Sequence, residues 1–420
     1  MQRSLRQAGW TAAALLCVVT AAPAQQLINK EQEEQFARAR FPYQQRVLTG
    51  QDKATKEQSD LAARYFVLRV TNLEARNEPK VMQVIVKDFE GLMAIAANES
   101  NAKVNREAVA LLTPPMIQRF KEVFELDFMP NSVAVVNAAI MLPHLARLKQ
   151  EEIADFLTGL IADPKKHDAI RVHALKGLRD YFPAKAFTKL EQTQKPLIAR
   201  RDRELKRVEA LLAMIDRPMP PTNDPQELDA FRFIRREAVT TLAEAQVPAI
   251  SSVGKLEGNV AQGLLKVLAK KNALEPSFTE RFEAAIGVCQ MRSRDVEEYD
   301  PAIGIYLVGE CLKDFAAEYK KDLANIKLGA KTRLPTFLAW KIESKRFEVA
   351  LNQMAQESRA PAAKTLAAAA TPMLRAMASA DAIDDSAVRK AVASIRPKAN
   401  TLYKGALKVD FDFEPPMEGQ

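Results

Sequence analysis

Residues 151–178, EEIADFLTGLIADPKKHDAIRVHALKGL, contain two amphipathic segments on either side of a short turn, and they decide the fold. In the first segment, five apolar residues recur at the period of one helix face: Ile153, Phe156, Leu157, Leu160 and Ile161. Asp163 and Pro164 end this helix, because the residue before a proline is disfavoured in the helical conformation. A second helix begins near Asp168, a suitable N-cap. Neither helix can bury its apolar side alone, so further pairs must stack against this one.

The second helix of this pair has counterparts elsewhere in the chain. Its core, IRVHALKGL at 170–178, recurs as IRREAVTTL at 234–242 and VNREAVALL at 104–112, and more loosely as AVVNAAIML at 134–142 and ERFEAAIGV at 280–288. All five segments keep a central alanine, which lets a neighbouring helix approach closely. Their starts lie roughly 30 to 64 residues apart, the range of helix-pair repeats with insertions.

This pattern, a turn with an aspartate followed by an apolar residue, an arginine, an alanine and a leucine, resembles the HEAT-repeat family. The resemblance is strongest at 163–178 and 224–242 and covers residues 81–291. It implies an α-solenoid of stacked antiparallel helix pairs. It also implies a ladder of ion pairs between turn aspartates and helix arginines, for which the matching residues are Asp163 or Asp168 with Arg171, and Asp224 or Asp229 with Arg235.

Composition agrees with an all-α protein. The 420 residues are 47% apolar but include only 14 glycines and 7% aromatic residues, which argues against a β-rich fold. We expect a helical-repeat domain at 59–357, with longer helices towards its carboxy-terminal end. Residues 25–58 are expected to form a polar linker or a mobile segment that includes a short helix, and residues 358–420 an alanine-rich helical segment with an acidic-aromatic tail.

Residues 1–24 have the form of a secretory signal peptide. Arg3 and Arg6 precede a short apolar stretch, and Ala22-Pro23-Ala24 has the small-x-small pattern of a cleavage site. An uncleaved anchor is the alternative, but the apolar stretch is shorter than the ~20 residues of a membrane-spanning helix. No later stretch is expected to span a membrane. The sequence therefore predicts an exported protein, periplasmic or secreted.

Charge and cysteine content leave alternatives open. Removing residues 1–24 lowers the formal net charge from +8 to +6, because two arginines are lost and no acidic residue is. The basic run at 200–207 is either an anion-binding face or, as its interleaved acidic residues favour, one side of an exposed helix. Cys289 and Cys311 are interpreted as two buried thiols, with a disulfide as the alternative.

No motif for catalysis is evident. The sequence has no phosphate-binding glycine loop, and its three histidines lack the spacing of a metal site. We therefore expect no enzyme activity, no cofactor, no metal and no small-molecule ligand.

Two functional hypotheses follow. The first is an exported scaffold that binds a protein or peptide through variable positions beside the apolar side of the second helices. The candidate partner-binding residues are His173, Lys176, Arg236, Glu237 and Thr240. The second is a HEAT-like enzyme or a nucleic-acid or anionic-ligand binder with a basic concave groove, against which mixed charge and few aromatic residues weigh. The proline-rich loop at 216–228 is either functional or a simple linker. The acidic-aromatic tail at 408–420 either docks in a groove of this chain or of another protein, or is a frayed end.

Overall fold

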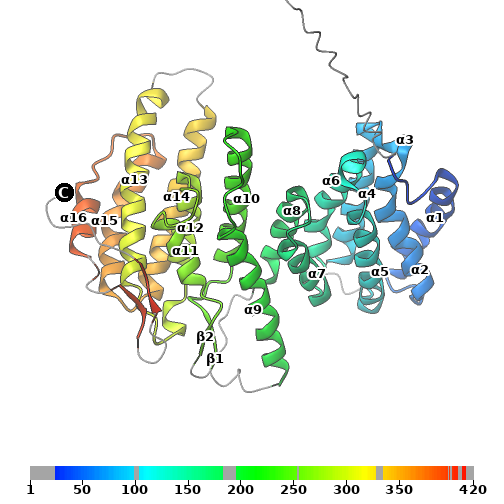
Figure 1. Ribbon diagram of the computed structural model, residues 1–420, viewed down its shortest axis with the longest axis horizontal. Helices are drawn as coiled ribbons and strands as arrows, with labels where there is room; N and C mark the ends of the chain where they lie inside the picture. Colours follow the sequence, from blue (N-terminus) through cyan, green and yellow to red (C-terminus); the bar gives the residue numbers. More distant parts are fainter. Residues whose placement is uncertain are drawn as a thin grey trace, which may run out of the picture.

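The computed structural model describes residues 24–98, 104–182, 195–252, 255–327, 334–395, 397, 400–404 and 409–412. Within these residues the protein is all-α, with sixteen α-helices packed against one another. The molecule is elongated, with α1 to α8 towards one end and α11 to α16 towards the other (Figure 1). One continuous hydrophobic core runs from Ile28 to Phe411.

The amino-terminal half contains the helices α1 (Lys30–Pro42), α2 (Lys56–Ala63), α3 (Leu73–Arg76), α4 (Pro79–Ala96), α5 (Arg106–Phe124), α6 (Phe128–Ala146), α7 (Glu151–Ala162) and α8 (Asp168–Leu178). The remaining helices are α9 (Lys195–Ile215), α10 (Pro225–Ala243), α11 (Val260–Leu268), α12 (Phe278–Gln290), α13 (Ala302–Lys327), α14 (Leu334–Glu357), α15 (Pro361–Ala378) and α16 (Ser386–Ser394). Two short antiparallel pairs are the β-structure of the described residues: β1 (Ile250–Ser252) with β2 (Lys255–Glu257), and β3 (Thr401–Tyr403) with β4 (Val409–Asp410).

The stretch that decides the fold forms the two predicted helices. In α7 all five predicted apolar residues are buried. The chain leaves α7 at Asp163, whose extended backbone precedes Pro164. The cap of α8 differs from the prediction: His167, not Asp168, is the N-cap, and its Nδ1 accepts a hydrogen bond from the Ala169 backbone N–H at 3.1 Å. The longer helices expected near the carboxy-terminal end are confirmed by α13, with 26 residues, and α14, with 24.

The helices make two series of contacts along the molecule. In the even series, α4, α6, α8, α10, α12 and α14 contact one another in that order. In the odd series, α5, α7, α9, α11 and α13 do the same. The two series meet where successive helices pack together, as α7 does with α8, α9 with α10, and α11 with α12. Each central even helix therefore has even neighbours on both flanks and odd helices behind it.

The central alanines are buried in all five related segments, but the segments are not all equivalent. Ala138, Ala174, Ala238 and Ala284 lie in even-series helices, and each is fully buried. Ala108 is also fully buried, but it lies in α5, a member of the odd series. The segment at 104–112 therefore resembles the others in pattern and not in position. Close contacts between helices require a small residue in both series. The alanine pattern alone therefore does not tell an even-series helix from an odd-series helix.

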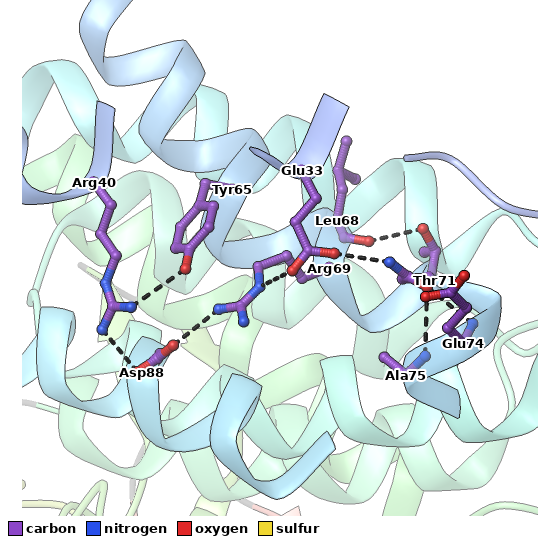
Figure 2. A network of polar contacts seen from close by, with 10 residues as sticks. Glu33, Arg40, Tyr65, Leu68, Arg69, Thr71, Glu74, Ala75 and Asp88 are labelled. Carbon is purple, nitrogen blue, oxygen red and sulfur yellow. Dashed lines mark hydrogen bonds and ion pairs between the residues drawn. The ribbon is translucent and has the colours of Figure 1, made fainter. Parts of the chain in front are cut away.

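The short helix expected within residues 25–58 is present as α1, and the segment is more firmly attached than a linker would be. These residues include α1, which is attached to the rest of the protein by a network of charged side chains (Figure 2). Arg40 donates to Asp88 of α4 at 2.8 Å, and Glu33 accepts from Arg69 at 2.8 Å. Arg69, in turn, donates to Asp88 at 2.9 Å. The polar composition of α1 thus reflects ion pairing at the end of the array and not a lack of structure.

The alanine-rich segment and the start of the tail are also packed. α15 buries one side and contacts α14 and α16. Phe411 is buried, and Asp412 forms an ion pair with Lys271 at 3.1 Å. The first part of the tail therefore docks on this chain, as one of the two sequence-based alternatives proposes. Residues 413–420, and residues 1–23 of the predicted signal peptide, lie outside the described part.

One helix departs from the expectation about membrane spans. By length and composition α6 is able to cross a membrane, with a mean hydropathy of 1.2 over an 18-residue window. Its apolar character has a structural explanation, because α6 packs between α4 and α8 and buries nine of its residues. It is the one described helix that meets this criterion.

Candidate partner-binding face

The strongly exposed large apolar side chains gather on one series of helices. Nine of them lie on even helices: Val81, Val84, Ile95, Met129, Val133, Phe233, Leu338, Ile342 and Val349. Three others, Phe41, Leu73 and Met219, lie outside both series. Among the described residues, no odd-series helix exposes such a side chain. An even helix between two others is covered on its flanks and back, so the exposed residues of α6 and α10 occupy its one free side, and α4 and α14 add exposed apolar residues at the two ends of the series. We call this free side of the even series the even face.

The predicted partner-binding residues lie on two neighbouring helices of this face. His173 and Lys176 are on α8, and Arg236, Glu237 and Thr240 are on α10, which contacts α8. The structure brings Lys176 and Arg236 to the same aromatic ring, that of Phe233. The Lys176 Nζ lies 5.8 Å from the ring centroid and the Arg236 Cζ lies 5.1 Å from it.

Phe233 is the residue that sequence reasoning missed. It is 39% exposed and lies three residues before Arg236 on the same side of α10. A phenylalanine flanked by Arg232 on a polar helix side was a usable signal, because large aromatic residues are normally buried. The exposed apolar positions of α4, α6 and α14 were also missed, although an apolar residue on a polar helix side is the same kind of signal.

Two of the predicted residues have structural contacts instead of free side chains. Glu237 is buried, and it accepts a hydrogen bond from Arg179 at the end of α8 at 2.5 Å. The Thr240 hydroxyl donates to the Arg236 backbone carbonyl at 2.9 Å. Glu237 is therefore a link between α8 and α10, and its negative charge is already paired.

Of the ion pairs predicted from the family resemblance, the described residues contain that of Asp168 with Arg171, which lies within α8, and not that of Asp224 or Asp229 with Arg235. Arg171 donates to Asp168 at 3.3 Å, and Asp168 also accepts from Arg217 at 3.1 Å. The Asp163 carboxylate accepts a hydrogen bond from the Lys165 backbone N–H, and its charge also acts on Arg171.

In the second repeat, Arg235 pairs with Glu280 of α12 at 2.5 Å and not with either predicted aspartate. Asp224 caps α10 through the Gln226 backbone N–H, and Asp229 pairs with Arg232. The aspartates are thus occupied locally, and the buried carboxylate of Glu280 is nearer to the guanidinium.

Several ionisable groups of the even series are partly removed from water. Burial raises the pKa of Glu343 on α14 and of Glu244 at the end of α10, and it lowers the pKa of His144 on α6. Burial, with a smaller contribution from Lys176, lowers the pKa of His173 to about 4. These four groups are therefore partly desolvated where they lie on the even helices.

The shifted histidine predicts a pH dependence of stability. With a folded-state pKa of about 4 and an ordinary value of 6.5, His173 binds a proton more weakly in the folded than in the unfolded protein. Unfolding is therefore favoured progressively as the pH falls from 6.5 to 4. After discounting for partial exposure of the ring, we expect a loss of about 1 to 3 kcal/mol across this window.

Urea unfolding at pH 7, 5.5 and 4.5 measures this effect. His173→Gln, which cannot titrate, should lose less free energy of unfolding than the unsubstituted protein between pH 7 and 4.5. Equal losses in both proteins would show that the ring is not desolvated in solution.

Two hollows lie away from the centre of this face. A groove of about 640 Å³ between α7 and α9 is lined by small residues and by Asp155, Arg203, Lys206 and Glu209. A pocket of about 310 Å³ lies beside the network of Figure 2 and is lined mainly by α1, α3 and their neighbours, with several glutamates. In the first hollow Arg203 pairs with Asp155 at 3.4 Å.

The basic run at 200–207 is largely used in such pairs. Arg207 is buried and contacts Glu151, which Arg203 also approaches at 4.0 Å. Arg201 pairs with Asp202 at 3.0 Å. These contacts favour the interpretation of the basic run as the charged side of an exposed helix, α9, over that of an anion-binding face.

The described residues hold no group of histidine, cysteine and acidic side chains that could bind a metal ion. Cys289 and Cys311 are free and buried, and burial raises the pKa of Cys311 to about 12. Comparison of the chain with family models, with curated proteins and with solved structures finds no match.

Proposed function

We propose that this protein is an exported helical-repeat scaffold and that its even face binds a protein or peptide partner. The observation that carries the proposal is the concentration of exposed large apolar side chains on the even series, which holds nine of the twelve among the described residues. Apolar residues exposed singly are normal on any protein, but their concentration on one side of an array is typical of an interaction surface.

The arrangement of an α-solenoid is part of this proposal. Two parallel series of contacts, joined by pairs of successive helices, are what stacked HEAT-like repeats would produce. In such arrays one series of helices lines the inner surface, where partners bind. The desolvated His173 and Glu343 support the assignment of the even series to that inner surface. Export is proposed from the sequence of residues 1–24 alone.

The alternative of a basic groove for nucleic acid has less support. The arginines of α9 are paired with acidic residues of α7, and the even face carries both signs of charge, for example Arg346 with Glu283. A nucleic-acid groove requires a concentration of unpaired cations along one track.

Substitution of exposed apolar residues tests the proposal. We expect Ile342→Glu combined with Val349→Glu to reduce partner recovery at least about tenfold, because a charge in a desolvated interface costs more than 1.4 kcal/mol. Both side chains are more than half exposed, at 55% and 68%, so the fold should be retained. The measurement is photocrosslinking and affinity capture of the mature protein from the envelope fraction, with circular dichroism to verify folding.

The matched control is Ala110→Glu, which places the same charge on an exposed position of α5 in the odd series. This control should recover partners normally. If it loses partners while the double variant keeps them, the partner-binding surface is on the odd series and the proposal is wrong.

A further inference from the structure

We infer that Phe233, Lys176 and Arg236 form a subsite for an acidic peptide segment with an aromatic or aliphatic side chain next to its carboxylate. This inference rests on the proposed function, because it names the partner chemistry for the centre of the even face. It depends on a ring that is exposed between two cations from two different helices.

The first step is the balance of charge around the ring. Glu237 is the carboxylate closest to Arg236, at 4.0 Å, but it is held by Arg179 at 2.5 Å. Among the described residues Lys176 has no ion pair, and its recorded contacts are the ring of Phe233 and the electrostatic effect on His173. Lys176 and Arg236 are therefore incompletely neutralised.

The second step concerns the acidic residues of the next two helices. Glu343 of α14 interacts with the charge of Arg236, but it accepts a hydrogen bond from Arg346 at 2.7 Å. Glu283 of α12 accepts from the same guanidinium at 2.9 and 3.1 Å. Glu343 and Glu283 thus share the single guanidinium of Arg346, and Glu343 partly neutralises Arg236. Lys176, for which the described residues show no ion pair, is the cation that remains for a ligand beside Phe233, with Arg236 next to it.

The third step is the chemistry of that ligand. A guanidinium binds a carboxylate through two parallel hydrogen bonds, and an ammonium adds a point charge without a preferred direction. The exposed ring of Phe233 offers a surface for an apolar or aromatic side chain beside that carboxylate. His173, whose charge interacts with that of Lys176, is itself partly buried, so the ammonium lies beside a partly desolvated group.

The surroundings of the subsite favour a peptide over a small carboxylate as the ligand. Further exposed apolar residues lie along the even series on both sides, with Val133 on α6 and Ile342 on α14. A segment that continues in both directions can use these residues, whereas an isolated carboxylate cannot. We therefore commit to a peptide as the ligand.

A labelled peptide, DFDFEPP, is a suitable probe because it alternates carboxylates with aromatic rings. Its sequence is that of residues 410–416 of this chain. We expect it to bind the mature protein and the amide analogue NFNFQPP to bind at least about tenfold more weakly. Arg236→Ala and Lys176→Ala should each weaken DFDFEPP binding about tenfold, and Phe233→Ala should do so without changing the salt dependence. Fluorescence anisotropy at two ionic strengths measures all of these.

The matched control is Lys206→Ala, which removes an exposed cation from the α7–α9 groove and should leave binding unchanged. The inference would be overturned by equal binding of DFDFEPP and NFNFQPP, or by unchanged binding in the α8 and α10 variants. It would also be overturned if the peptide did not bind at about 1 mM, the order of magnitude of the weakest affinity that the assay can use. The proposed function is judged separately by the Ile342 and Val349 variants. If partner capture depends on those residues while DFDFEPP does not bind, the inference fails and the function stands.

Discussion

Glu280→Ala is expected to lower the free energy of unfolding by about 3 to 5 kcal/mol, because it leaves a buried guanidinium without its counter-ion. The side chains of Arg235 and Glu280 are 1% and 0% exposed, and their Nε and Oε1 atoms are 2.5 Å apart. Arg235 also donates to the Leu274 carbonyl at 2.8 Å. A buried charge whose partner is removed keeps the full cost of its desolvation.

The same substitution removes half of the capping box of α12. Glu280 accepts a hydrogen bond from the Ser277 backbone N–H at 2.6 Å, and this bond is lost, whereas the Ser277 hydroxyl still accepts from the backbone N–H of residue 280. Loss of the side-chain bond weakens the first turn of a helix that contacts α10, α11, α13 and α14. The effect on stability therefore combines a packing, a charge and a capping contribution at one position.

Urea unfolding followed by circular dichroism measures the loss. The double variant Arg235→Met with Glu280→Leu should be destabilised less than Glu280→Ala alone, since it leaves no charge behind. Arg232→Ala is the control for an exposed pair, because its partner Asp229 is 76% exposed, and it should cost less than about 1 kcal/mol. A loss below about 1 kcal/mol for Glu280→Ala would mean that water reaches this pair in solution.

The sequence predicts well what depends on neighbouring residues. The apolar period of α7 and the break at Asp163 and Pro164 match the structure, because helix faces and helix ends are set by residues within one or two turns. The burial of the central alanines is predicted for the same reason, since they occupy the apolar side of their own helices.

What the sequence could not predict is which distant residues meet. Arg235 and Glu280 are 45 residues apart, and Arg179 and Glu237 are 58 apart. No local period contains that information, and the turn aspartates that seemed to match Arg235 had closer partners. The segment at 104–112 was grouped with the other four for the same reason. Its central alanine, Ala108, is buried as theirs are, but it lies on α5, a helix of the odd series.

The candidate site shows both outcomes. Lys176 and Arg236 were found because they follow the apolar stripe at a variable position, and the contact between α8 and α10 then brings them to one ring. Glu237 has the same pattern in sequence, yet it is buried against Arg179. Whether a polar residue beside a stripe is free or paired depends on the neighbouring helix, which the pattern does not specify.

Tyr403→Ala is expected to cost about 3 to 5 kcal/mol, because it removes a fully buried aromatic side chain that joins the tail to the helical array. Its hydroxyl lies 3.0 Å from both the Pro248 carbonyl and the Asn259 side-chain oxygen, and burial raises its pKa well above the ordinary value of 10.0. Its ring also packs against Tyr299 at a centroid distance of 5.5 Å.

The backbone of this strand adds contacts that a side-chain substitution leaves in place. Asp300 donates to the Leu402 carbonyl and Lys404 donates to the Glu298 carbonyl, each at 2.8 Å. We therefore expect Tyr403→Ala to open the tail locally before the array unfolds, with faster hydrogen exchange at Asp300 and Lys404. Tyr403→Phe, which keeps the ring, should cost only about 1 to 3 kcal/mol.

Hydrogen exchange and urea unfolding of the three proteins separate these contributions, with Lys404→Ala as the control at an exposed position of the same segment. The control should change the free energy of unfolding by less than about 1 kcal/mol. Because Tyr403 is 155 residues from Pro248 in sequence, its contacts form only when the tail crosses to the loop after α10. Exchange at Asp300 that is equally slow in Tyr403→Ala and in the unsubstituted protein would show that the backbone contacts alone hold the tail, and that the ring contributes nothing to its attachment.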